Sequence, residues 1–180
     1  KLLADAATPQ AVRDRAWFHL GKVMYARGYF EQSGEALRRA GSALPQDMAA
    51  ERTLLLAQGL MKLGRFDEAA GVLGSFAGPS DWQAFGQFNL GVALVRGERI
   101  DEGLALLDAV GQRAAVTEEM KSLRDKANVA LGYALLQAGR PAEARVALER
   151  VRLDGPQSSK ALLGAGWADA AAGQYEAALA

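Results

Sequence analysis

The feature that most constrains this chain is a short pattern that recurs about every 34 residues. A glycine is followed, after one or two intervening residues, by a residue at a fixed place: Phe30, Phe66, Ile100, Pro141 and Tyr175. The differences between successive sequence numbers are 36, 34, 41 and 34. A unit of this length cannot bury an apolar face alone, so several copies must stack on one another. The recurrence therefore predicts a repeat architecture rather than an ordinary globular domain.

The stretch before each glycine has the pattern of an amphipathic helix with a small residue near its middle. Apolar residues recur at i, i+3, i+4 and i+7, and the pair Leu-Gly stands at Leu20-Gly21, Leu90-Gly91 and Leu131-Gly132. Glycine inside a helix costs about 1 kcal/mol relative to alanine. Its repeated use therefore indicates that a neighbouring helix approaches closely at this point.

The first copy carries the fullest signature, which consists of Trp17, Leu20-Gly21, Tyr25, Gly28, Phe30, Ala36, Ala40 and Pro45. This signature resembles the tetratricopeptide repeat (TPR), a helix-turn-helix unit of about 34 residues. Ser33, Gly103 and Pro141 depart from the usual pattern. The resemblance implies an all-α fold, a right-handed α-solenoid of antiparallel helix pairs with about five units, the last incomplete. It also implies a fragment of a longer bacterial TPR protein.

The register divides the chain into repeats that together are expected to form one domain over residues 1–180. Their approximate bounds are 9–45, 46–79, 80–113, 114–156 and 157–180. The interval of 41 exceeds 34 by almost two helical turns, which keeps the face of the helix unchanged. We therefore expect a long first helix in the fourth repeat, from about Thr117 to Ala138, with Thr117 as N-cap and its first turns projecting beyond the stack.

The composition argues against an enzyme, a metalloprotein and a nucleic-acid binder. The chain has no cysteine, a single histidine at His19, and 21 basic against 21 acidic residues. One histidine on a helix cannot supply a nucleophile–base pair or a metal ligand set by itself, and nucleic-acid binders are usually basic. No run of 18 apolar residues occurs, so no transmembrane segment is expected. We predict no catalytic residue, no metal site and no cofactor.

The TPR resemblance implies instead a protein or peptide partner in a concave groove lined by the first helix of each pair. An apolar groove with polar edges suits a partner helix or peptide. Some of the lining side chains will instead pack between helices. The register assigns the groove to Arg15, Phe18, Lys22, Tyr25, Leu54, Gln58, Met61, Phe85, Phe88, Asn89, Val92, Lys126, Val129, Tyr133, Lys160, Leu163 and Trp167.

A sharper alternative is a clamp for the carboxylate of a partner's C-terminus, which some members of the family carry. Gln58, Asn89 and Lys126 fall near the corresponding places, but Leu54 and Ala130 stand where that clamp has basic side chains. The match is partial, and Asn89 is also interpreted as a buried amide bonded to helix backbone.

Three settings for a binding scaffold stay open. The first is an adaptor in bacterial cell-envelope assembly, which the resemblance and the alanine-, glycine- and arginine-rich sequence favour. The second is a cytosolic client-peptide chaperone or regulator, and the third is the docking arm of an enzyme whose catalytic part lies outside this chain. Self-association through an exposed apolar C-terminal end is a further expectation, because terminal repeats normally need a polar cap.

Overall fold

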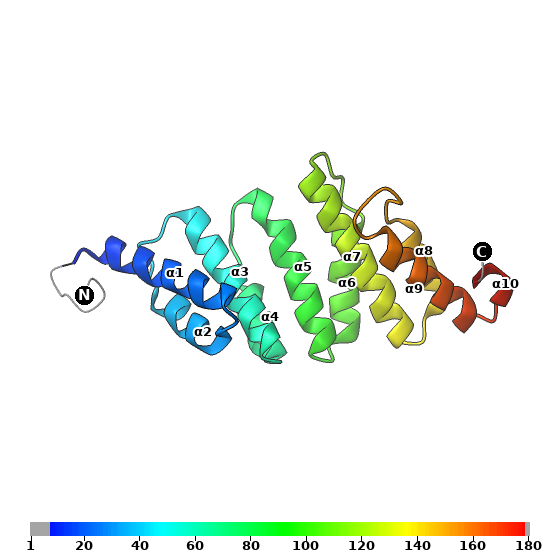
Figure 1. Ribbon diagram of the computed structural model, residues 1–180, viewed down its shortest axis with the longest axis horizontal. Helices are drawn as coiled ribbons and strands as arrows, with labels where there is room; N and C mark the ends of the chain where they lie inside the picture. Colours follow the sequence, from blue (N-terminus) through cyan, green and yellow to red (C-terminus); the bar gives the residue numbers. More distant parts are fainter. Residues whose placement is uncertain (1–7, 179–180) are drawn as a thin grey trace. The chain divides into compact units, whose positions relative to one another are not determined.

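The computed structural model describes residues 8–178, and this part of the chain forms ten α-helices joined by short loops (Figure 1). Every repeat supplies two of them. The bounds are α1 Gln10–Ala26, α2 Phe30–Arg39, α3 Gln46–Lys62, α4 Phe66–Gly74, α5 Ser80–Arg96, α6 Ile100–Gly111, α7 Glu118–Gln137, α8 Pro141–Glu149, α9 Ser158–Ala171 and α10 Tyr175–Ala178.

The chain divides into two compact units, unit 1 over residues 1–93 and unit 2 over residues 94–180. In unit 1, α1 packs on α2, α2 on α3 and α3 on α4, and α1 also contacts α3. In unit 2, α6 to α10 pack in the same sequential way, and α7 also contacts α9. These contacts confirm the predicted all-α fold of sequential helix pairs. The single domain over residues 1–180 stays a prediction.

One turn, used in all five repeats, generates the recurring pattern in the sequence. The residue at the fixed place is in each case the first residue of the second helix. Two positions before it, a residue in the left-handed region follows the end of the first helix, with φ between 65° and 80°. Two hydrogen bonds close the turn in the Schellman arrangement, for example Tyr29 N–H to the Met24 carbonyl (3.0 Å) and Gly28 N–H to the Tyr25 carbonyl (2.9 Å).

Four of these five left-handed residues are glycines, and the fifth is Glu98, with φ 65°. The sequence places the glycine of this turn one position earlier, at Gly97. The fold nevertheless keeps the same geometry, because Arg99 N–H still reaches the Leu94 carbonyl (2.9 Å). A residue with a Cβ therefore occupies a conformation that normally favours glycine.

The mid-helix glycines allow close helix approach, as predicted. A Cβ on Gly21 would lie 2.6 Å from the Leu37 side chain, and a Cβ on Gly132 would lie 2.5 Å from that of Leu148. Both leucines are almost fully buried. The glycines at these positions are thus a packing requirement of the α1–α2 and α7–α8 contacts.

The long helix of the fourth repeat is α7, and its N-cap is Thr117, whose side chain accepts a hydrogen bond from Met120 N–H (3.2 Å). The bounds agree with the prediction. That its first turns project beyond the stack stays a prediction, but they are tied to the fold, because the Glu118 carboxylate there accepts a hydrogen bond from the Arg152 guanidinium (2.9 Å) in the loop after α8.

Candidate protein-binding faces

The predicted groove residues lie on the first helix of each pair, namely α1, α3 and α5 in unit 1 and α7 and α9 in unit 2. Three of the apolar ones face the interior of the fold. The exposed fractions of Phe18, Leu54 and Val129 are 1%, 6% and 9%. Phe18 belongs to the cluster with Leu37, and Val129 to the cluster with Leu148. These three positions form the floor that supports the face rather than a surface that a partner could touch.

The polar residues of the unit 1 face form a chain of hydrogen bonds across three helices. The Tyr25 hydroxyl donates to Gln58 Oε1 (3.4 Å), and Gln58 Nε2 donates to Asn89 Oδ1 (3.5 Å). Asn89 is buried, and its Nδ2 donates to the Phe85 carbonyl (2.8 Å). Burial raises the pKa of Tyr25 above its ordinary value. Gln58 and Asn89, the two amides of the clamp alternative, thus have partners inside the protein.

Two charges of the unit 1 face also pair within it. Lys22 Nζ lies 2.5 Å from Glu51 Oε1, which joins α1 to α3. The same ammonium lies 5.4 Å from the centroid of the Phe18 ring, at cation–π distance. Among the other predicted residues, Arg15 is exposed and Met61, Phe85, Phe88 and Val92 are half-buried. This face therefore offers partly covered apolar side chains around the matched pair Lys22–Glu51, with the exposed Arg15 beside them.

The unit 2 face presents two aromatic rings in a fixed arrangement. Tyr133 on α7 and Trp167 on α9 meet edge to face, with ring centroids 5.9 Å apart and planes at 83°. The Tyr133 hydroxyl donates to the Lys160 carbonyl (3.0 Å). A Cβ on Gly164 would lie 3.2 Å from Tyr133 Cε2, so this glycine leaves room for the ring.

Trp167 is 54% exposed, and Leu163, one turn earlier on α9, is 53% exposed. Tyrosine and tryptophan are enriched among the residues that dominate binding energy at interfaces. Because Tyr133 is held by its hydrogen bond and by Trp167, little side-chain entropy would be lost when a partner contacts the pair. The pair and Leu163 together, called the aromatic face below, are the best-formed apolar surface among the predicted residues.

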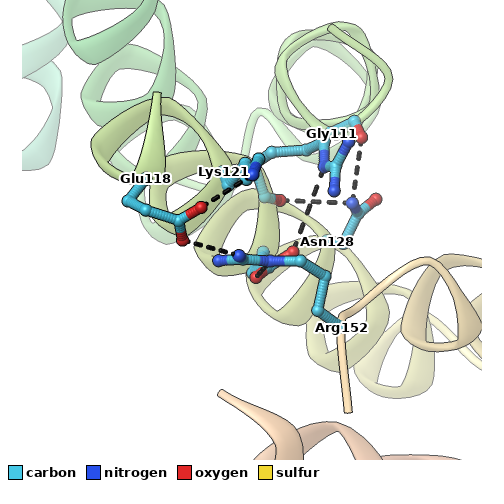
Figure 2. Close-up of polar contacts among 7 residues, drawn as sticks. Gly111, Glu118, Lys121, Asn128 and Arg152 are labelled. Carbon is cyan, nitrogen blue, oxygen red and sulfur yellow. Dashed lines mark hydrogen bonds and ion pairs between the residues drawn. The ribbon is translucent and has the colours of Figure 1, made fainter. Parts of the chain in front are cut away.

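A buried polar cluster at the start of α7 was not foreseen from the sequence (Figure 2). Asp125 is fully buried; its Oδ2 accepts from Arg152 Nε (2.8 Å), and its Oδ1 lies 4.0 Å from Arg124 Nε. The neighbouring Asn128 donates to the Gly111 carbonyl (2.9 Å). The cluster joins α6, α7 and the loop after α8.

Glu118 is the exposed member of this cluster. Hydrogen bonds from Lys121 first, and then from Arg152, lower the pKa of Glu118 to about 2. The hydrogen bonds that Arg152 donates to Glu118 and Asp125 raise the pKa of its guanidinium further above the ordinary value. Each acid is matched by a cation, as in a structural ion-pair network.

One sequence signal could have revealed the cluster. Asp125 stands seven positions before Gly132, and Asp14 stands seven positions before Gly21. Asp14 is likewise fully buried, and it accepts hydrogen bonds from Gln10 Nε2 (2.5 Å) and Ala43 N–H (3.0 Å). An acid at this register on an otherwise apolar helix stripe indicates a buried carboxylate that fixes the loop after the second helix.

Within residues 8–178, no group of histidine and acidic side chains is arranged to hold a metal ion. His19 is exposed, and its ring packs against Phe18 with centroids 5.4 Å apart. None of the helices in the described part of the chain is long and apolar enough to cross a membrane.

The comparisons with known proteins agree with this geometry. The tetratricopeptide repeat family matches residues 50–75 and 127–150, which lie in α3–α4 and α7–α8. A sequence comparison with curated proteins gives no match.

Solved structures of MamA share the fold. MamA of AMB-1 is 21% identical, with 91% of each chain covered and a TM-score of 0.68. MamA of MSR-1 is 20% identical, with 93% of this chain and 91% of that chain covered and a TM-score of 0.67. MamA of Desulfovibrio magneticus RS-1, from residue 41 to the end, is 16% identical, with 92% and 89% covered and a TM-score of 0.70.

Proposed function

We propose that this chain, a tetratricopeptide repeat protein, is a non-enzymatic scaffold that binds a segment of a partner protein on the first helices of its repeats. Repeat arrays of this kind bind partners along extended surfaces. The observation that carries the proposal is the aromatic face of unit 2. Trp167 and Leu163 are more than half exposed, and Tyr133 holds Trp167 edge to face.

The aromatic face has the properties of an interface centre. Such centres combine rigid aromatic side chains with nearby aliphatic ones, surrounded by polar residues that exclude water. Leu163 and Trp167 stand one turn apart on α9, which matches the one-turn spacing of apolar residues on a partner helix. The pairing of Lys22 with Glu51 makes unit 1 the weaker candidate.

A cross-linking experiment tests the proposal. A photo-cross-linking amino acid replaces Leu163 on α9, and in a matched protein it replaces Val146 on α8; the two side chains are 53% and 52% exposed. After irradiation in a lysate of the source organism, mass spectrometry identifies the adducts. We expect a protein adduct from position 163 that a Trp167→Glu substitution removes.

Two controls make the result decisive. Circular dichroism must show that the Trp167→Glu variant keeps its helices, because Trp167 also contacts Tyr133. The same adducts from position 146 would contradict the proposal, since they would place binding on the second helices. An adduct to nucleic acid alone would contradict it as well.

The setting of this scaffold is a separate matter. A role as an adaptor in bacterial cell-envelope assembly stays a prediction, and so do the alternatives of a cytosolic chaperone or regulator and of an enzyme's docking arm. Localisation of the full protein by fractionation of the source cells separates the first setting from the second.

Self-association is a second candidate, favoured by the exposed apolar side chains of the last helices. Leu162 is 60% exposed and Tyr175 is 69% exposed. Light scattering at rising concentration should then give a mass above 19.1 kDa, and Leu162→Glu with Tyr175→Glu should restore that mass. A monomer at every concentration contradicts this candidate.

A further inference from the structure

Two lysines lie on the same helices as the aromatic face, and the scaffold role alone does not explain them. Lys126 on α7 and Lys160 on α9 stand in the same register of successive repeats. Each precedes an aromatic residue by seven positions, Tyr133 and Trp167 respectively. Seven positions are about two helical turns, or roughly 10 Å along the axis. Lysine and aromatic residue therefore lie on one side of each helix.

Neither lysine is neutralised within the protein. Both side chains are exposed, and neither ammonium has an ion-pair or hydrogen-bond partner in the described residues 8–178. The other basic residues of α7 do have acidic neighbours, at 2.7 Å for Lys121 and 4.0 Å for Arg124. Two unmatched cations on contacting helices form a positive end beside the aromatic face.

The same register in unit 1 shows that this arrangement is not a necessity of the fold. There, Arg15 on α1 and Glu51 on α3 stand where unit 2 has its two lysines. Glu51 is paired with Lys22 at 2.5 Å. Unit 1 therefore has an acid in this row, which pairs with a neighbouring lysine, whereas unit 2 has none at the corresponding places.

We propose that the unit 2 face binds an acidic amphipathic helix of a partner protein. This inference rests on the proposed function and adds the chemistry of the partner. Apolar side chains of the helix pack on Leu163, Trp167 and Tyr133, and carboxylates about two turns away accept hydrogen bonds from Lys126 and Lys160. Charge-assisted hydrogen bonds of this kind are stronger than neutral ones, and the unmatched lysines also attract an acidic partner from a distance.

Nucleic acid could also use two lysines and two exposed rings. The composition favours the acidic helix, because the chain has 21 basic and 21 acidic residues and therefore no excess of positive charge. Leu163 contributes apolar area on which a base has nothing to stack, whereas an aliphatic or aromatic side chain packs on it.

The test uses three fluorescein-labelled helical peptides of the same length. They share one stripe of leucine and phenylalanine, and their flanking positions two turns away carry glutamate, glutamine or lysine. Fluorescence anisotropy measures binding to the whole chain, and a labelled single-stranded oligonucleotide serves as a fourth probe. We expect the glutamate peptide to bind about tenfold more tightly than the glutamine peptide, and the lysine peptide to bind most weakly.

Charge reversal then locates the effect. Lys126→Glu with Lys160→Glu should reverse the order of the glutamate and lysine peptides. A matched variant, Lys62→Glu with Arg27→Glu, makes the same change in net charge at exposed positions of unit 1 and should keep the original order. Circular dichroism checks both proteins, and all four substituted side chains are exposed, so folding should be retained.

The remaining outcomes separate the two proposals. Equal binding of all three peptides, lost in Trp167→Glu, overturns the acidic helix and leaves the proposed function standing. No binding of any peptide at concentrations up to about 1 mM counts against both proposals. Tighter binding of the oligonucleotide than of the glutamate peptide overturns the acidic helix in favour of nucleic acid.

Discussion

The helix pairs α1–α2 and α7–α8 are packed alike in their interior and differ on their surface. Gly21 and Gly132 occupy the same place in the first and the fourth repeat, and each lies against the leucine sixteen positions later, Leu37 or Leu148. On the outward face, Lys22 occupies the register of Tyr133. The comparison teaches that helix approach fixes the interior of a repeat, whereas the exposed positions are free to carry either matched charges or an aromatic surface.

The comparison extends to the buried acids. Asp14 and Asp125 occupy one register and are both fully buried. The partner of Asp14 in the following loop is a backbone amide, Ala43 N–H, whereas that of Asp125 is the guanidinium of Arg152. The same position therefore fixes the loop after the second helix by two different kinds of interaction. We expect removal of the acid to lower the free energy of unfolding by different amounts in the two repeats.

The largest loss in the free energy of unfolding is expected from Asp125→Ala. The change leaves Arg152 and Arg124 partly buried without their carboxylate, and breaking a buried ion pair by removing one partner costs about 3–5 kcal/mol. Urea denaturation followed by a unit 2 probe, such as Trp167 fluorescence in a protein without other tryptophans, should show this loss. A loss below about 1 kcal/mol would mean that water reaches both guanidinium groups and replaces the carboxylate, as at an exposed ion pair.

Asp14→Ala should cost less, about 1–3 kcal/mol, because it leaves a neutral amide without its acceptor. The measurement is the same urea experiment with a probe in unit 1, such as Trp17. If Asp14→Ala proved more harmful than Asp125→Ala, the distinction between the two chemistries would be wrong. Arg152→Ala serves as a control that should affect unit 2 alone.

Glu98→Gly should stabilise unit 2 by about 1 kcal/mol, because glycine adopts the left-handed conformation without the cost that a Cβ brings. The other four turns already have glycine at this position. The matched change in unit 1, Gly64→Glu, should destabilise by a similar amount. Thermal denaturation gives the change in melting temperature for both variants. Equal melting temperatures for wild type and Glu98→Gly would show that the turn is unstrained.

The smallest expected effect on stability concerns Glu118 and its dependence on pH. Because the pKa of Glu118 is lowered to about 2 from an ordinary value of 4.5, its ion pairs stabilise the folded state above pH 4.5. This contribution is lost as the pH falls toward 2. The stability difference between wild type and Glu118→Gln should therefore shrink over this window. A carboxyl titration by NMR with a midpoint near 4.5 would contradict the predicted contacts with Lys121 and Arg152.

Much of the fold could be predicted from sequence because it depends on local signals. The Schellman turns leave a glycine and a residue at a fixed place after it, so Phe30 and Pro141 could be identified as equivalent positions of their repeats. The fixed spacing then located the helix pairs. Glu98 escaped this reasoning, since only the backbone geometry shows that it takes the place of a glycine.

The candidate site was less predictable, because exposure depends on the rotation of each helix against its neighbours. Phe18 and Trp167 are both aromatic residues on first helices, yet one is buried and the other exposed. The contact between Asp125 and Arg152 joins side chains 27 positions apart, and helical periodicity carries no information about such a pair. The lysine–aromatic spacing is visible in the sequence, but only the structure shows that the lysines are unpaired.

The five Schellman turns also have a consequence for how the chain folds. Each turn is closed by hydrogen bonds between residues at most five positions apart. Helices α1–α4 and α6–α10 pack mainly on their immediate neighbours along the chain. Contacts of short sequence separation form early and quickly. A helix pair leaving the ribosome can therefore form before the next pair has been synthesised, and each new pair finds a folded surface on which to assemble.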